Sequence, residues 1–250
     1  MAKMNLLSIV QKVAIALGSD EVSSIDSTPD SRDIASIAED VYYELMAKRD
    51  WPHMTALTKA NSLSNSDKPN YLSIPEEVSE LRFVSYNTRT SSQTKDNFVP
   101  VEYVTPETFL IKSNKLNSSL SNVKTITDYN GVTLYVRNDK APSYYTTFDE
   151  TKLVFDSYDS SVESSLQGFK SQLLVSKAPA FEKNNNSFVP NLPSEAFPLF
   201  LSELISTASI ILNREPNQKE EAKAQRQRRR MAGKSWTVTK PLETVDYGRR

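Results

Sequence analysis

The chain has 250 residues and a formal net charge of −1, and it contains no cysteine and a single histidine, His53. This composition excludes a disulfide framework and the usual Cys/His zinc sites. Five scattered glycines with no glycine-rich fingerprint give no support for a phosphate-binding loop.

The charges are unevenly distributed along the chain. From Arg214 onward there are 11 Lys and Arg against 5 Asp and Glu, whereas residues 1–213 hold 19 against 26. This asymmetry favours a C-terminal segment that binds an acidic surface or a nucleic acid. The longest apolar run, residues 199–212, contains Glu203 and falls short of the ~20 residues that cross a bilayer, so no membrane association is predicted.

Two amphipathic helices are predicted near the N-terminus. The first covers residues 4–17, and Gly18 follows it where a left-handed C-cap belongs. Its apolar stretch superficially resembles a secretion signal. Gln11 and Lys12 interrupt that stretch, however, and the apolar positions keep a helical period, which favours a retained helix.

The second helix is expected to start after Thr28 and to end near Asp50, because Pro52 disfavours helix at Trp51. Two helices of this size cannot cover each other's apolar faces. A third helix, predicted at residues 197–212, is the expected partner, so the helical domain would be built from both ends of the chain.

Between residues 70 and 182 the apolar pattern changes from a helical period to a period of two, which is typical of strands. Thr105 is expected to start a short helix that reaches about residue 112. Pro100 restricts its strand to an edge or a bulge. Asn130 and Gly131 predict a tight two-residue hairpin turn, and residues 144–155 a second hairpin. The predicted extended segments are residues 71–75, 78–84, 99–103, 123–129, 132–137, 144–148, 153–155 and 169–175.

The last part of the chain is predicted to hold two helices of opposite character. The helix at residues 197–212 is apolar around most of its circumference. The stripe expected to face water consists of Ser202, Ser206, Ser209 and Asn213. Pro216 suits the first position of the next helix, which has almost no apolar face.

This second helix is expected to be exposed and basic at its end. Glu220 and Glu221 lie near its start, and its last turn is expected to hold Arg226, Arg228, Arg229 and Arg230, an arrangement that suits the helix dipole. After Gly233 the periodicity stops. The remaining tail includes Trp236, Val238, Tyr247, Arg249 and Arg250.

Together these elements predict an α+β protein. The predicted arrangement is a discontinuous helical bundle formed by the N- and C-terminal helices, residues 1–55 and 192–232. A β-rich domain is inserted at residues 70–182, and an extended C-terminal arm covers residues 233–250.

Several short motifs follow one another along the chain: Ala16-Leu17-Gly18, Val22-Ser23-Ser24-Ile25, Lys48-Arg49-Asp50-Trp51 and Leu72-Ser73-Ile74-Pro75-Glu76-Glu77-Val78. With the order of the elements, these motifs resemble the head-to-tail adaptor proteins of short-tailed bacteriophages, the tail tubular protein A type. Pro52, His53 and Met54 depart from the run that usually follows the Trp in that family.

This resemblance implies a virion structural protein rather than an enzyme, with no cofactor or metal. It implies a homo-oligomeric ring of twelve copies that joins the portal protein to the tail nozzle or fibre proteins. The ring bore would pass the genomic DNA during ejection, and a C-terminal arm would reach onto the portal. The residues expected to contact the portal or another partner are Arg226, Arg228, Arg229, Arg230, Trp236, Tyr247, Arg249 and Arg250.

The arginine run has three readings that the sequence leaves open. It can be a solvated helix end, it can dock onto portal carboxylates through bidentate pairs, or it can contact DNA phosphates. The main functional alternative is therefore a nucleic-acid-binding accessory protein that uses the same basic helix.

A glycan-degrading or glycan-binding tail component is a further alternative. It would use Asp149, Glu150 and Asp156 as paired carboxylates, although acids at a hairpin turn are usually solvated. The tyrosines that could form a sugar-binding face, or pack as cross-strand pairs, are Tyr129, Tyr135, Tyr144, Tyr145 and Tyr158. Trp51 is expected to fill a core at a helix end, and His53 to lie at the surface.

Overall fold

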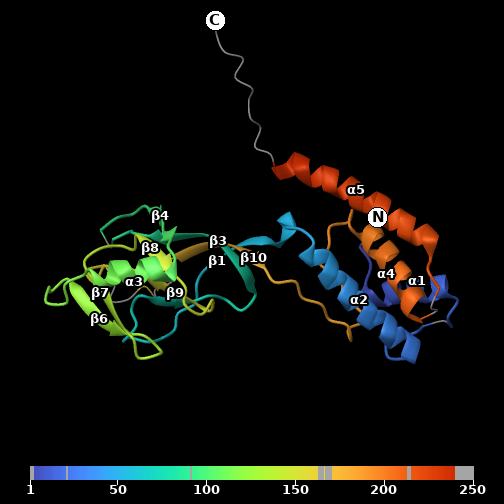
Figure 1. Ribbon diagram of the computed structural model, residues 1–250, viewed down its shortest axis with the longest axis horizontal. Coiled ribbons are helices and arrows are strands. Elements are labelled where there is room, and N and C mark those ends of the chain that lie inside the picture. The colour runs from blue at the N-terminus through green and yellow to red at the C-terminus, as the bar shows by residue number, and fades with distance from the viewer. Residues whose placement is uncertain are drawn as a thin grey trace, which may run out of the picture. The chain divides into compact units, whose positions relative to one another are not determined.

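The computed structural model describes residues 3–20, 22–90, 92–162, 166, 171–212 and 215–239, with the backbone alone for residues 233–239. The protein is mixed α+β, and it divides into two compact units (Figure 1). Met1–Trp51 and Pro179–Arg250 form the helical unit, and Pro52–Ala178 forms the β-rich unit.

Helix α1, Leu6–Leu17, has both of its ends capped by sequence features. The Asn5 side chain accepts a hydrogen bond from the Ser8 backbone N–H at 3.0 Å. Gly18 has φ of 75°, and its N–H closes the last turn. The predicted left-handed C-cap is therefore confirmed, in a conformation that a side chain would strain.

Helix α2, Pro29–Ala47, begins with a reciprocal capping box. Thr28 Oγ1 accepts from the Ser31 N–H, and Ser31 Oγ accepts from the Thr28 N–H, both at 3.1 Å. The helix ends three residues before the expected Asp50. Helix assignments commonly differ by this much at a C-terminus without a strong stop signal.

Helices α4, Phe197–Leu212, and α5, Gln218–Thr239, complete the helical unit, and α4 packs against α1, α2 and α5. The inner face of α4 is fully buried at Phe197, Phe200 and Leu204. This three-way contact satisfies the expected need for a third apolar partner.

Two predictions about α5 are wrong. The helix begins at Gln218 rather than at Pro216, because the Asn217 side chain caps it by accepting from the Glu220 N–H at 3.2 Å. It also continues past Gly233 to Thr239, since one glycine inside a helix costs only about 1 kcal/mol. The arginine run therefore lies in the middle of the helix and not in its last turn.

The segment at residues 179–192 packs on the helices of this unit. Phe188 O accepts from the Leu6 N–H at 2.7 Å. Asn186 bonds to the Ile25 N–H and to Ser24 Oγ, both at 3.1 Å. The Phe181 ring lies 5.2 Å from that of Tyr42. These contacts tie the segment to α1, α2 and their connection.

The β-rich unit has two four-stranded sheets and one two-stranded ribbon, with strand orders β1-β10-β3-β4, β2-β9-β8-β5 and β6-β7. All strand pairs are antiparallel except β5 with β8. The strands are β1 Thr55–Thr58, β2 Tyr71–Ser73, β3 Val78–Asn87, β4 Phe98–Pro100, β5 Glu102–Tyr103, β6 Val123–Thr127, β7 Thr133–Arg137, β8 Tyr144–Thr146, β9 Lys152–Phe155 and β10 Ser171–Lys177. The unit also contains the 3-10 helix η1 Pro52–Met54 and the helix α3 Pro106–Asn114.

The single strand predicted at residues 99–103 is two strands in two different sheets. β4 is an edge strand of the first sheet, as Pro100 requires. β5 is an edge strand of the second sheet. Between them the Val101 N–H bonds to Val84 O at 2.9 Å, and the chain changes sheet at this residue. Alternation alone cannot reveal such a change, because both pieces keep a period of two.

The β6–β7 hairpin is confirmed, but its predicted two-residue turn is wrong. The Gly131 N–H bonds to Asp128 O at 3.1 Å, and the Asp128 N–H bonds to Val132 O at 2.7 Å. The loop therefore holds three residues, and Gly131 alone has a positive φ, of 81°. This is a type I turn followed by a glycine bulge. The β8–β9 hairpin is also present.

The second unit has its own core. It combines inward-facing residues of both large sheets with Phe109 of α3, which starts after Thr105 as predicted. Its fully buried large side chains include Tyr71, Leu72, Phe109, Ile126 and Phe155.

Candidate docking site

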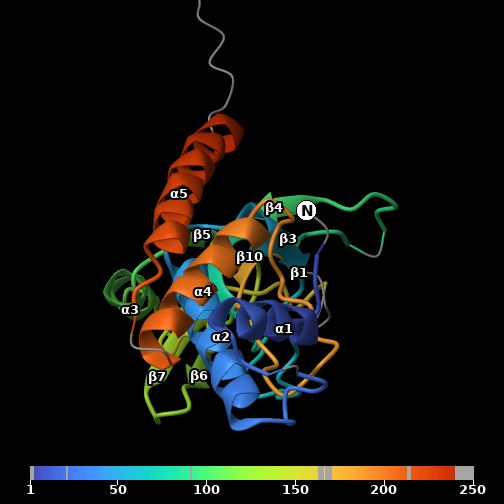
Figure 2. The ribbon, with the colours of Figure 1, turned by 90° about the vertical axis from the view of Figure 1, so that its right-hand side faces the viewer.

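Helix α5 touches α4 through a narrow stripe and exposes the rest of its surface. Along residues 218–232 only Ala224 is buried, and the residues of intermediate exposure are Glu220, Gln227 and Met231. The spacing of these four residues is 4, 3 and 4, which marks one side of a helix. We call them the packing seam. Figure 2 shows the last turns of α5 standing clear of α1, α2 and α4.

The serine stripe of α4 is buried, so the prediction that it faces water is wrong for Ser202, Ser206 and Ser209. These side chains are 0 %, 9 % and 6 % exposed, and Asn213 lies outside the described residues. The stripe is flanked by Glu203, which pairs with Arg228, and by Pro198, which lies beside Arg230 in a groove. Small side chains let two helix backbones approach closely, so the serines mark a packing face.

The apolar end of α4 is correspondingly more exposed than its sequence suggests. Ile210 and Ile211 are 54 % and 57 % exposed. They lie in the last turn of α4, where apolar residues still recur at helical spacing. No described element covers these two side chains. The hydrophobic pattern therefore predicted the helix correctly and its buried face only in part.

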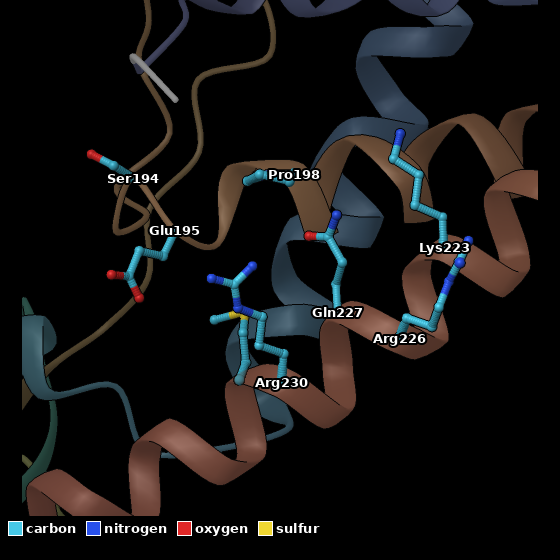
Figure 3. Close-up of a pocket in the computed structure, with 8 residues that line it drawn as sticks. Ser194, Glu195, Pro198, Lys223, Arg226, Gln227 and Arg230 are labelled. Carbon is cyan, nitrogen blue, oxygen red and sulfur yellow. The ribbon is translucent and has the colours of Figure 1, made fainter.

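A groove of about 490 Å³ runs beside the packing seam, between α5 and the chain that leads into α4 (Figure 3). Gln227 and Arg230 extend from α5 on one side, with Pro198 on the first turn of α4 opposite. The residues that line this groove are Ser194, Glu195, Pro198, Lys223, Arg226, Gln227, Arg230 and Met231.

The four predicted arginines do not form one patch. Arg226 and Arg230 line the groove, and Arg226 Nε also donates to Ala222 O at 3.2 Å. Arg228 points back to Glu203 of α4. Arg229 is exposed, and no ion pair joins it to another residue of the described ranges. The helical rotation of 100° per residue separates neighbours in sequence, so a consecutive run is distributed around the helix.

Four predicted contact residues lie, wholly or with their side chains, outside the described residues. Trp236 belongs to α5, but only its backbone is described. Tyr247, Arg249 and Arg250 lie outside the described residues. Their assignment as partner contacts stays a prediction.

Sequence reasoning missed Lys219 and Lys223, which lie on the same side of α5 as Arg226 and Arg230. The signal was present in the spacing. Residues 219, 223, 226 and 230 are separated by 4, 3 and 4 positions, so they lie on one side of the helix. Each of them directly precedes one residue of the packing seam. We call these four cations the basic stripe.

The lining of the groove is mostly basic. Its charged lining is Lys223, Arg226 and Arg230 with the single carboxylate Glu195. Lys223 Nζ also contacts Glu220 at 3.1 Å. No group of three or more His, Cys, Asp or Glu side chains placed to hold a metal occurs among the described residues. Guanidinium groups on one helix side suit carboxylates or phosphates of a partner.

The carboxylates considered for glycan chemistry lie apart. Asp149 and Glu150 lie in the turn before β9, whereas Asp156 follows its other end. Asp149 accepts from the Thr151 and Lys152 N–H groups at 3.0 Å. Burial raises the pKa of Asp149, but the hydrogen bonds from Lys152 and Thr151 outweigh this effect, and the pKa is lowered. These bonds are typical of a turn residue.

Asp156 is a structural residue. It is 6 % exposed, and its Oδ1 accepts from the Ser143 and Tyr144 N–H groups at 2.8 and 3.0 Å. Its Oδ2 lies 3.3 Å from Lys140 Nζ. These partners occupy the carboxylate and fix the start of β8. Asp156 is thus held by bonds within its own hairpin, at the opposite end of β9 from Asp149 and Glu150.

The tyrosines do not form one exposed face. Tyr145 and Tyr158 are buried, and burial raises their pKa values. Tyr129 is 49 % exposed and meets Tyr71 edge-on at 5.8 Å. Tyr135 and Tyr144 are half-buried. Packing within the sheets accounts for most of these side chains.

Trp51 fills the core at the end of the first helical segment, as predicted. It is 3 % exposed, its Nε1–H donates to Leu45 O at 3.3 Å, and the Arg49 guanidinium lies 4.3 Å from the ring centroid. His53 is exposed in η1.

In the ranges that the structure describes, no helix combines the length and the apolar character that a bilayer crossing requires. No protein-family model matches the chain, and no curated protein matches it either.

Proposed function

We propose that this protein is a virion structural protein, a subunit of the head-to-tail adaptor ring that joins the portal to the tail of a short-tailed bacteriophage. In this proposal twelve copies form a ring around a channel for the genomic DNA. The ring contacts the portal protein on one side and nozzle or fibre proteins on the other. The protein acts by binding, without chemistry.

The observation that carries the proposal is the construction of α5. A helix of 22 residues is attached to its own unit by the packing seam and the Arg228–Glu203 ion pair, and most of the rest of its described circumference is exposed and rich in Lys and Arg. Such a helix contributes little to its own core. A large exposed basic surface of this kind is expected where a partner covers it after assembly.

The proposed architecture assigns these parts to roles. The helical domain, residues 1–55 and 192–232, would form the ring body, and the inserted β-rich domain, residues 70–182, would face the tail. The arm, residues 233–250, would reach onto the portal. Trp236 and Tyr247 would supply aromatic anchors, and Arg249 and Arg250 would supply charge-assisted bonds.

A nucleic-acid-binding accessory protein is the second candidate, and the basic stripe is the observation that favours it. Four cations on one side of a helix suit a phosphate backbone. Two carboxylates oppose this assignment, since Glu195 lines the same groove and Glu220 pairs with Lys223. A mixed lining of this kind fits a protein partner better than a polyanion.

The proposal is tested by binding to a purified portal ring from the same genome. The full chain should bind with equal copies of the two proteins, and a chain ending at Thr239 should bind at least about tenfold more weakly. The DNA alternative predicts instead an affinity that falls steeply with salt and weakens when Arg226 and Arg230 are replaced by Ala. Absence of portal binding at every concentration, together with salt-dependent DNA binding, would overturn the adaptor proposal.

A further inference from the structure

The basic stripe of α5 is not neutralised within its own chain. Lys223 contacts Glu220, and Arg226 Nε bonds to a backbone carbonyl. Lys219 and Arg230 form no ion pair or hydrogen bond with another described residue, and both are exposed. A row of cations about 16 Å long, at 1.5 Å per residue, therefore faces outward beside a groove.

Helix α2 carries a matching row of acids. Asp33, Asp40 and Glu44 are all exposed, and their offsets of 7 and 11 residues place them on one side of the helix. Lys219, Arg226 and Arg230 have the same offsets. We call Asp33, Asp40 and Glu44 the acidic stripe. Three residues of the basic stripe are therefore separated by the same intervals as the three acids, and they carry the opposite charge.

The two stripes do not pair within one chain. Helix α4 packs against both α2 and α5, and neither Asp33 nor Asp40 forms an ion pair among the described residues. Glu44 pairs with Lys48 at 2.5 Å on its own helix, and the charge of Arg228 on α5 also helps to lower the pKa of Glu44. Asp40 lies near Lys183, which pairs with Glu39. Asp33 of the acidic stripe, and Lys219 and Arg230 of the basic stripe, thus keep exposed charges that no ion pair among the described residues balances.

We propose that the basic stripe of one copy binds the acidic stripe of the next copy, so that α5 of each molecule lies against α2 of its neighbour. The contact joins two different surfaces and is therefore heterologous. An open assembly therefore has one unpaired stripe at each end. It either closes into a ring or grows into a filament.

Apolar groups beside the charges complete the proposed contact. Tyr43 is 39 % exposed and lies next to Glu44 in sequence, on the outer side of α2. In the groove, Pro198 of α4 and Met231 of α5 add apolar groups beside the cations. An exposed aromatic that enters a groove with a Pro and a Met would bury apolar area at the centre of the contact, with the ion pairs around it.

Only the role of the ring in this inference rests on the proposed function. The contact itself is tested by self-association, which is measured without a portal. Exposed ion pairs are individually weak and screened by salt, so the stripes act as a set. Assembly should therefore weaken as salt is raised, and single substitutions should have small effects.

The test is a charge exchange. One variant carries Arg226→Glu with Arg230→Glu, and the other carries Asp33→Lys with Asp40→Lys. The control carries Lys3→Glu with Lys12→Glu, which reverses the same number of exposed cations of the helical unit outside the basic stripe. Sedimentation velocity and native mass spectrometry give the oligomer, and circular dichroism checks the fold of each variant.

The wild type and the control should assemble alike, and each exchanged variant alone should assemble about tenfold more weakly or worse. An equal mixture of the two variants should recover the wild-type oligomer with alternating copies, because every contact in it again joins opposite charges. Recovery in the mixture also shows that each variant folds.

The inference is overturned if the wild type stays monomeric at all concentrations, if the exchanged variants assemble as well as the control, or if the mixture does not recover. Self-association that follows the charge exchange without any portal binding would instead overturn the adaptor function alone. Portal binding by a ring that ignores the exchange would overturn this contact alone.

Discussion

Arg228 of α5 forms an ion pair with Glu203 of α4, and this contact engages one arginine of the basic run within its own chain. The Glu203 side chain is 16 % exposed and that of Arg228 is 46 % exposed. Because α4 and α5 follow each other in the chain, a pair between the middle of one and the middle of the other fixes an antiparallel register. Arg228 is thus a structural residue, whereas its neighbour Arg229 is available to a partner.

Replacement of Arg228 by Ala should lower the free energy of unfolding by about 1 kcal/mol, since a half-exposed ion pair contributes roughly this much or less. Arg229→Ala should change it by less than ~0.5 kcal/mol. A double-mutant cycle with Glu203→Gln, measured by urea unfolding, isolates the coupling. A coupling energy near zero would show that the pair does not hold α5.

Replacement of Ala224 by Leu should destabilise the protein by about 1–3 kcal/mol. Ala224 is 2 % exposed in the packing seam, so the three added carbons have no room between α4 and α5. Ala222→Leu is the matched control, because it makes the same change on the exposed side of the same helix. Equal thermal stability of the two variants would contradict the assigned seam.

The pH dependence of stability should contain a contribution from Tyr42. Burial, with a smaller effect of Tyr43, raises the pKa of Tyr42 to about 12. Below pH ~10 both the folded and the unfolded state keep this proton. Between pH ~10 and 12 only the unfolded state ionises, so stability falls, by about 3 kcal/mol at the upper end.

Tyr42→Phe should remove this alkaline loss and should cost less than ~1 kcal/mol at neutral pH. The Tyr42 hydroxyl is buried and has no hydrogen-bond partner in the described ranges, so its removal leaves no group unsatisfied. Urea unfolding of both proteins at neutral pH and near pH 11 measures the difference. Parallel loss of stability in the two proteins would refute the assignment.

Replacement of Asp156 by Ala should destabilise the β-rich unit by about 2–3 kcal/mol. It would leave the Ser143 and Tyr144 N–H groups without their acceptor and Lys140 without its partner. Asp67→Ala, at an exposed position, is the surface control. If Asp156→Ala abolished a glycan-cleaving activity while unfolding was unchanged, the structural role given to Asp156 would be wrong.

The sequence was sufficient for local features whose cause is local. The caps at Thr28, Thr105 and Gly18 follow from side chains that bond to the neighbouring backbone or from a required positive φ. The α+β class follows from the change in hydrophobic period. Buried Trp51 follows from a large apolar group at a helix end.

The predictions that failed concern contacts between secondary-structure elements. The serine stripe is polar in sequence, but it is buried, because the pattern of one helix does not show which of its sides other helices will cover. The groove and the basic stripe require α4 and α5 to be packed antiparallel, and Lys219 and Lys223 gain meaning only with that packing. The change of sheet at Val101 is likewise decided by tertiary hydrogen bonds.

Native mass spectrometry of the protein, alone and mixed with the portal protein encoded by the same genome, tests the central claim most directly. The account predicts an oligomer of the protein by itself and a complex with equal numbers of portal and adaptor copies. A protein that remains monomeric and leaves the mass of the portal ring unchanged at every concentration would contradict it.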